Sequence, residues 1–323
     1  MARCLISFGA NLGDPQSSVL AAVDRLQQAL EPGDTVSLSS LYESPPVGGP
    51  SGQATFVNAV AAIQTRLSVW QVWEIIKSIE QQLGRQRIER WEARRIDMDI
   101  LLYDEQRIWT PHLKVPHPRM CMRRFILQPA NQVAPDWIDP VSTWTIKQLS
   151  DSLQSGPGNL LLVADRQLNP DKILSDIGCS TGSRQIDALA LLSGRIGNCD
   201  RRSVGWIDMK TLFAWMQSTQ DRPATKGCIE PKSQIQCLDE KGHAMSAKLL
   251  FFWMPAFPDQ AWEQRYIQLA QQLGLAETHP GEGQRRLPRL GPRYLMASSD
   301  TQWVSHELSA ALQAMDCTIQ PIS

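Results

Sequence analysis

The sequence changes character at a segment rich in serine, glycine and proline around residues 151–159, whose clearest break is Gly156-Pro157-Gly158. Such a composition interrupts helices and strands and is typical of a linker. At 323 residues the chain is also long for one compact core, so length alone favours two domains. We therefore predict a first domain over residues 1–153, a linker over 154–159 and a second domain over 160–323.

In the first half, some segments have apolar residues at helical spacing and others have the apolar runs or alternation typical of strands. Strands are predicted over residues 4–8, 35–42, 55–65 and 96–103, where apolar residues form short runs or alternate with polar ones. One helix is expected to begin at Pro15 with Asp14 as its cap, and another to run from Ser68 to Leu83. The order strand, helix, strand, strand, helix, strand predicts an antiparallel sheet backed by helices on one face, a ferredoxin-like plan.

The second half has a different pattern, with continuous apolar runs at residues 160–164, 204–207 and 248–254. Each is followed by polar or helical sequence, as the buried strands of a parallel sheet would be, and helices are expected over 262–273 and 303–315. We predict a second α/β domain with a mostly parallel sheet.

The second half contains no pattern that identifies an activity. Residues 178–184 have glycines near phosphate-loop spacing but lack the Lys-Ser/Thr ending, so we interpret them as a loop. The arginine-rich residues 285–293 are interpreted as a solvated connection, because two prolines and a glycine interrupt them. The second domain is either a scaffold that joins copies of the chain into a homo-oligomer or a second, nucleotide-handling enzyme.

Composition excludes several classes of protein. The formal net charge is -1, so no global field attracts the chain to nucleic acid or to a membrane surface. The longest apolar run, residues 249–257, is interrupted by Pro255, and the apolar N-terminal residues are too few for a signal sequence. The seven cysteines form no C-x-x-C pair, which favours reduced thiols and a cytoplasmic location.

The most informative segment covers residues 84–102, where an arginine-rich stretch precedes Asp97-Met98-Asp99. Residues two apart on a strand point to the same side, so the two carboxylates would be neighbours. They would repel each other unless a cation lay between them, and such hard oxygen ligands suit Mg²⁺. Five arginines lie between residues 85 and 95, and guanidinium groups bind phosphate oxygens. From these residues alone, a phosphoryl-transfer site and a solvated, ion-paired loop both remain open.

Four segments in order resemble the motifs of the 6-hydroxymethyl-7,8-dihydropterin pyrophosphokinase family, an enzyme family of folate biosynthesis. The segments are residues 8–14, residues 40–48 with 56–60, residues 84–102, and residues 115–120 followed by Arg123 and Phe125. The resemblance covers about residues 3–150. It implies transfer of diphosphate from ATP to the hydroxymethyl group of the pterin, with ATP as co-substrate and two Mg²⁺ ions as cofactors.

The resemblance also implies roles for individual residues. Asp97 and Asp99 would bind the metal ions and, with Arg85 and Arg94, form the catalytic group. The implied ATP-binding residues are Glu80, Arg85, Arg90, Trp91, Arg94, Ile100, His117 and Arg123. The implied pterin-binding residues are Ser44, Pro46, Val47, Phe56, Asn58 and Phe125. A flat heteroaromatic ring fits between two aromatic faces, and an amide can pair with its polar edge.

The sequence departs from the family pattern in the arginine-rich loop. Glu92-Ala93 stands where a small residue followed by proline is usual, and the loop is about one residue shorter than in some members. Met122 occupies a position where an acidic residue is frequent. These changes remove neither a metal ligand nor a stacking ring, so we predict an active enzyme. A pterin- or nucleotide-binding module without catalysis is the alternative.

Overall fold

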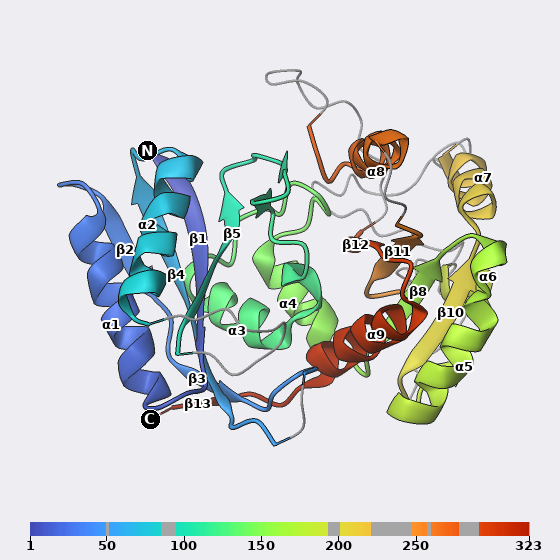
Figure 1. Ribbon diagram of the computed structural model, residues 1–323, viewed down its shortest axis with the longest axis horizontal. Coiled ribbons are helices and arrows are strands. Elements are labelled where there is room, and N and C mark those ends of the chain that lie inside the picture. Colours follow the sequence, from blue (N-terminus) through green and yellow to red (C-terminus); the bar gives the residue numbers. More distant parts are fainter. Residues whose placement is uncertain are drawn as a thin grey trace, which may run out of the picture.

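The computed structural model describes residues 1–49, 52–84, 95–192, 201–220, 247–256, 260–277 and 291–322. Figure 1 shows two sheets side by side, each with its own helices, and the helix α9 (Thr301–Asp316) lying between them. Among the described helices, none combines the length and apolar character that crossing a membrane requires.

The first sheet is antiparallel and has the order β13-β3-β4-β1-β5, with β2 also paired to β4. Its strands are β1 (Ala2–Ala10), β2 (Thr35–Leu38), β3 (Tyr42–Ser44), β4 (Phe56–Thr65), β5 (Asp97–Tyr103) and β13 (Gln320–Pro321). The neighbours β5, β1, β4 and β2/β3 reproduce the predicted ferredoxin-like plan. A separate ribbon joins β6 (Ile108–Trp109) to β7 (Lys114–Val115).

The strand predicted over residues 35–42 is divided into β2 and β3 by a bulge. Between Leu38 and Tyr42 this edge advances four residues, whereas β4 advances only three, from Ala61 to Asn58. The extra residue lies between Ser39 and Tyr42, because Ser39 still faces Val60: its amide donates to the Val60 carbonyl at 2.9 Å, and its hydroxyl accepts from the Val60 amide at 3.0 Å. The hydroxyl oxygen thus takes the place of a backbone carbonyl as acceptor in the hydrogen-bond ladder between the strands. The spacing of apolar residues in the sequence does not reveal such an irregularity.

Helices cover both faces of the first sheet. On one face lie α1 (Pro15–Ala29) and α2 (Val69–Gln82), which begin at the predicted caps Asp14 and Ser68. The other face is covered by α3 (Arg124–Val133), whose Leu127 packs in one core cluster with Leu5. The two predicted helices therefore share one face, as expected, and α3 is an additional helix that the sequence did not predict on the other face. Pro129 inside α3 concealed this helix, because proline usually ends a helical pattern.

The second sheet is parallel, as predicted, with the order β12-β11-β8-β10-β9. Its strands are β8 (Asn159–Val163), β9 (Arg184–Gln185), β10 (Ser203–Ile207), β11 (Leu250–Met254) and β12 (Arg293–Ala297). The other helices of the chain are α4 (Ile146–Gln154), α5 (Pro170–Thr181), α6 (Ala188–Leu192), α7 (Met209–Gln220) and α8 (Gln260–Gln272), with short 3-10 turns η1 (Met120–Met122) and η2 (Arg166–Leu168).

Two interpretations of the second half are corrected. Residues 178–184 are not simply a loop, because α5 continues through Gly178 to Thr181 and ends at Gly182, whose φ of 67° suits glycine. In the arginine-rich stretch, residues 285–290 lie outside the described residues. Arg293 begins β12, is only 3% exposed and donates through Nη2 to the Val141 carbonyl, so it is not part of a solvated connection.

One continuous core joins the two halves. A single cluster contains Leu5 and Leu127 from the first half together with Leu160, Phe251 and Leu308 from the second. The chain then returns to the first sheet, where β13 pairs with β3 (Figure 1). Between α4 and β8, only residues 155–158 lack regular structure. The exact division into two domains and a linker stays a prediction.

Candidate active site

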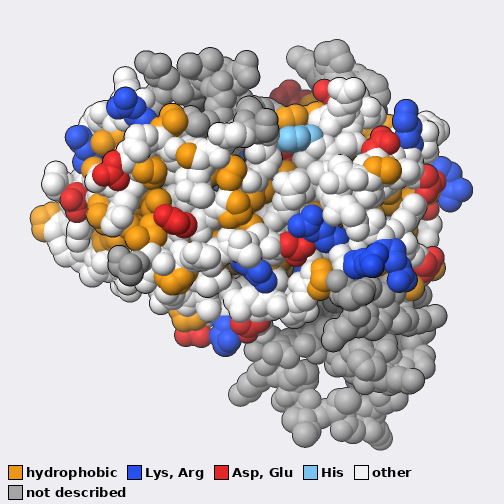
Figure 2. Space-filling view, turned by 90° about the horizontal axis from the view of Figure 1, so that it is seen from below, with side chains coloured by type: hydrophobic (Ala, Val, Ile, Leu, Met, Phe, Trp, Pro, Cys, Tyr) orange, Lys and Arg blue, Asp and Glu red, His pale blue; other side chains and the backbone are white. Residues whose placement is uncertain are grey.

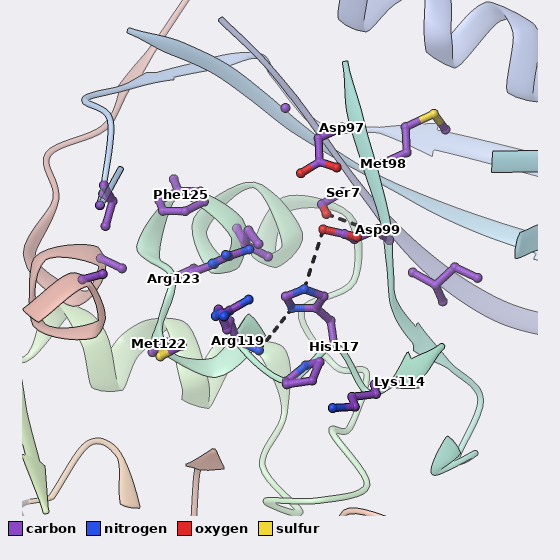
Figure 3. Close-up of a pocket in the computed structure, with 18 of the residues that line it drawn as sticks. Ser7, Asp97, Met98, Asp99, Lys114, His117, Arg119, Met122, Arg123 and Phe125 are labelled. Carbon is purple, nitrogen blue, oxygen red and sulfur yellow. Dashed lines mark hydrogen bonds and ion pairs between the residues drawn. The ribbon is translucent and has the colours of Figure 1, made fainter. Parts of the chain in front are cut away.

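A cavity of about 1010 Å³ lies between the first sheet and the β12–α9 part of the second half. This volume is at the upper end for small-molecule sites. Its lining includes Asp97, Asp99, His117 and Phe125 from the first half, and also residues of β12 and α9. Figure 3 shows the first-half residues converging on the cavity from β5, from the turn after β7 and from the start of α3.

Asp97 and Asp99 line the cavity from neighbouring positions on β5 (Figure 3). Between them Met98 is 1% exposed and belongs to the core beneath α1 and α2. On the adjacent strand β1, Gly9 pairs with Asp97 and Ser7 pairs with Asp99. The alternation therefore gives two side-by-side carboxylates, as the sequence predicted.

The donors available around this pair fit Mg²⁺. The part of the chain that the structure describes contains no group of three or more His, Cys, Asp and Glu residues able to enclose a metal ion. Magnesium does not require such a group, because it is commonly held by one or two carboxylates, water and substrate phosphates. Two hard oxygen donors beside a wide cavity meet that requirement.

Glu80 on α2 fixes the strand that carries the aspartates. This buried carboxylate accepts a hydrogen bond from the Met98 amide at 2.9 Å and another from Lys77 Nζ at 2.9 Å. Glu80 also lines the cavity, and its predicted contact with ATP stays a prediction. Its observed bonds hold α2 against β5 between the two metal-ligand candidates.

His117 is largely buried, and its Nε2 faces Asp99. Burial lowers its pKa well below 6.5, Arg123 and Arg119 lower it further, and Asp97 acts in the opposite direction. Its Nδ1 accepts from the Arg119 amide at 3.2 Å, and we therefore assign its proton to Nε2. That nitrogen lies 3.6 Å from Asp99 Oδ2, and Figure 3 shows both contacts.

Two arginines complete the cationic side of the cavity. Burial lowers the pKa of Arg123 to about 10, and neighbouring Arg119 contributes to this shift. The Arg123 guanidinium carbon also lies 5.6 Å from the centroid of the Phe125 ring. The sequence did not single out Arg119, which binds Glu307 of α9 through Nε and Nη2. Glu307 was also missed, although an acidic residue among the apolar positions of the predicted helix was a possible signal.

All but one of the residues predicted for the pterin line the same cavity. Asn58 Nδ2 donates to Ser44 Oγ at 2.9 Å, and both residues are buried. The cavity lining includes Ser44, Asn58, Val47, Phe56, Phe125 and also Ile100, but Pro46 is not part of it. Arg85, Arg90, Trp91 and Arg94, like the Glu92-Ala93 departure, lie outside the described residues.

Comparison with known proteins identifies the family. Residues 5–135 match the model of the 7,8-dihydro-6-hydroxymethylpterin-pyrophosphokinase (HPPK) family. The 2-amino-4-hydroxy-6-hydroxymethyldihydropteridine pyrophosphokinase of Pseudomonas aeruginosa is 41% identical over 134 residues, which are 42% of this chain and 82% of that protein. The chain belongs to the HPPK family. The enzyme of the same name from Haemophilus influenzae is 38% identical over 47% of this chain and 95% of its own length.

The family match includes every site residue predicted from the sequence but neither β12 nor α9. One solved structure, described as HPPK-DHPS in complex with substrates, has a TM-score of 0.36 and 15% identity, covering 47% of this chain and 43% of that chain. So low a score supports no conclusion about the second half. The part of the cavity formed by α9 therefore lies outside the matched region.

Proposed function

We propose that this cavity transfers diphosphate from ATP to the hydroxymethyl oxygen of 6-hydroxymethyl-7,8-dihydropterin, releasing AMP, in folate biosynthesis. The relatives' name describes a pyrophosphokinase acting on this pterin. The observation that carries the proposal is the pair Asp97 and Asp99 in the cavity lining, with His117 Nε2 3.6 Å from Asp99 Oδ2. Transfer of this kind depends mainly on alignment and charge neutralisation, and the cavity offers groups for both.

Asp97 and Asp99 would hold two Mg²⁺ ions together with the ATP phosphates. Bound Mg²⁺ would supply charge neutralisation to the phosphate oxygens. Glu80 would keep the two carboxylates in register, because its bond to the Met98 amide fixes the strand between them.

The cationic and donor groups would bind the phosphates directly. Arg123 offers bidentate hydrogen bonds, and His117 would donate through Nε2 without bringing a charge of its own. Arg85 and Arg94 are proposed as further phosphate ligands, and Arg90 and Trp91 as part of a loop that closes over the reactants. Ile100 would contact the adenine, and Glu80 would lie near the nucleotide.

The pterin would lie between Phe56 and Phe125, with Asn58 pairing with its polar edge. Ser44 holds the Asn58 amide, and the backbone around Pro46 and Val47 would complete the recognition. In this arrangement the hydroxymethyl oxygen would attack the β-phosphorus of ATP. No side chain is proposed as a strong base.

Several finer points belong to the same proposal. The cytoplasm remains our proposed location, and among the described cysteines Cys4, Cys121 and Cys317 are buried, free thiols. On the face shown in Figure 2, the described basic and acidic side chains are interspersed, which favours small-molecule substrates over nucleic acid. A homo-oligomer and a second enzymatic activity both remain hypotheses for the second half. Tight pterin binding without AMP formation would favour the alternative of a binding module.

The test is to incubate the full chain with ATP, Mg²⁺ and the hydroxymethyl pterin and to separate the nucleotide products. AMP is expected, and release of ADP instead would refute diphosphate transfer. Asp97→Asn should reduce turnover at least about 100-fold, because removal of one charge weakens the metal site. Asp104→Asn is the matched control: Asp104 directly follows the same strand, but its carboxylate accepts the Arg3 amide outside the cavity. Full activity in Asp97→Asn would refute the metal role.

A further inference from the structure

The second half of the chain forms one wall of the cavity. On α9 the lining residues Trp303, Glu307, Ala310, Ala311 and Ala314 recur at helical spacing, so one face of this helix is turned to the cavity. The three alanines have short side chains and leave room. Glu307 is different, because it brings a carboxylate to a cavity that would bind phosphates.

Glu307 is paired so completely that it presents no uncompensated charge. The residue is 1% exposed, and its two carboxylate oxygens accept from Arg119 Nε and from Arg119 Nη2, the latter at 3.0 Å. The Arg119 guanidinium carbon also lies 5.6 Å from the centroid of the Tyr294 ring. Burial raises the pKa of Tyr294, Arg119 acts in the opposite direction, and the negative charge of Glu307 raises it further. Two residues of the second half therefore fix the plane of Arg119.

Arg119 in turn is bound to the predicted phosphate-binding histidine. Its amide donates to His117 Nδ1 at 3.2 Å, which directs His117 Nε2 to within 3.6 Å of Asp99 Oδ2. Figure 3 shows this succession from Arg119 to His117 to Asp99. Glu307 and Tyr294 raise the pKa of Arg119 despite its burial, and Asp99 contributes to this rise. The contacts form one path from α9 to the metal-ligand pair.

We propose that Glu307 is a positioning residue for diphosphate transfer, holding Arg119 and through it His117, so that the second half completes the active site of the first. The proposal rests on the proposed function. It assigns α9 a role that a scaffold would not have. A separate scaffold would leave turnover unaffected by changes on α9, whereas a positioning residue affects turnover more than substrate affinity.

The test uses the full chain and compares Glu307→Gln with Asp316→Asn. Asp316 lies at the other end of α9 and pairs with Arg202 at 2.7 Å, without lining the cavity. Each substitution removes one charge from a partly or fully buried ion pair on the same helix. We expect Glu307→Gln to lower kcat at least about 10-fold with the KM for pterin changed less than about 3-fold. Asp316→Asn should lower the melting temperature but leave kcat within about 2-fold.

Two further variants define the path. Arg119→Ala combined with Glu307→Gln should be no slower than Arg119→Ala alone, because both act through the same guanidinium. Tyr294→Phe removes only a hydroxyl and should lower kcat about 2- to 5-fold, so it serves if Glu307→Gln fails to fold.

If the unmodified chain makes no AMP, the proposed function fails. If the unmodified chain is active and the Glu307→Gln and Tyr294→Phe variants have the same kcat as that chain, the positioning role alone is overturned. The same conclusion follows if Asp316→Asn lowers kcat as much as Glu307→Gln does. An additive loss in the double variant would overturn action through Arg119.

Discussion

At the scale of single residues, Asn58 needs a fixed orientation to recognise a pterin. A free amide side chain can rotate away from the pterin edge, but the hydrogen bond from Asn58 Nδ2 to Ser44 Oγ at 2.9 Å holds this side chain in place. Ser44→Ala should raise the KM for pterin about 2- to 10-fold, because one hydrogen bond contributes about 0.5–1.5 kcal/mol, and leave the KM for ATP unchanged. Steady-state AMP formation measures both constants.

The control for Ser44→Ala is Ser150→Ala, which truncates an equally buried serine on α4, away from the cavity. An unchanged pterin KM in Ser44→Ala would contradict the orienting role. A rise in the KM for ATP of the same size would also contradict it, because a general disturbance of the cavity would then explain both.

Residue-scale prediction succeeded where the signal was local. Asp97 and Asp99 are two positions apart on a strand, so the alternation of side chains was enough to place them together. The protonation of His117 was not predictable, because it depends on burial and on a backbone amide in a turn. The bond between Arg119 and Glu307 joins residues 188 positions apart, and no pattern in one sequence encodes such a distance.

At the scale of elements, α2 shows how a helix end supports the site. Ser68 and Gln71 form a capping box, with each side chain bonded to the other residue's backbone. Ser68→Ala should lower the free energy of unfolding by about 1 kcal/mol, because an amide at the helix start loses its acceptor. Urea denaturation measures the change. Ser78→Ala, an exposed change inside the same helix, should stay within about 0.5 kcal/mol of the original chain. Equal stability of the two variants would contradict the capping argument.

Elements with a strong apolar period and a recognisable cap were predicted correctly, as α1, α2 and α9 show. Two of the elements that were missed, α3 and β12, contain residues that conceal the pattern. Proline lies inside α3, and β12 begins with a buried arginine whose Nη2 reaches the Val141 carbonyl. In α3 the fold tolerates a proline inside the helix, and in β12 a tertiary contact holds the arginine in the strand. Both effects outweigh the local propensity, and the sequence alone reveals neither of them.

At the scale of the whole molecule, Lys248 ties the linker to the second sheet. It is 6% exposed, and Nζ donates to the Gly156 carbonyl at 2.6 Å and the Leu153 carbonyl at 3.3 Å. Burial lowers its pKa from 10.5 to about 8, with Asp316 acting in the opposite direction. Between these two pH values the unfolded chain binds more protons than the folded chain, so this lysine's contribution to the free energy of unfolding increases with pH.

Lys248→Met isolates that contribution. The free energy of unfolding of the original chain minus that of the variant should increase from pH 8 to pH 10, as measured by urea denaturation at several pH values. A difference between the two chains that is constant across this range would contradict the lowered pKa of Lys248 in the folded state.

The strand β13 brings the end of the second half back to the first sheet, beside the segment expected to bind pterin. Gln320 and Pro321 pair with Glu43 and Tyr42 of β3, and the Ile322 amide donates to the Leu41 carbonyl at 2.8 Å. Since β3 ends at Ser44, the first residue of the pterin segment, β13 supports that segment from outside. Deleting residues 319–323 should remove both the edge hydrogen bonds and the packing of Ile322 against the core.

We expect this deletion to lower the free energy of unfolding by about 2–4 kcal/mol and to raise the KM for pterin more than the KM for ATP. Ile322→Ala is the matched control, because it keeps the strand pairing and removes only the side chain. It should lower stability while leaving the pterin KM close to that of the original chain. If the deletion affects the two KM values equally, β13 stabilises the molecule without supporting the pterin segment, and the second half then acts on the site through α9 alone.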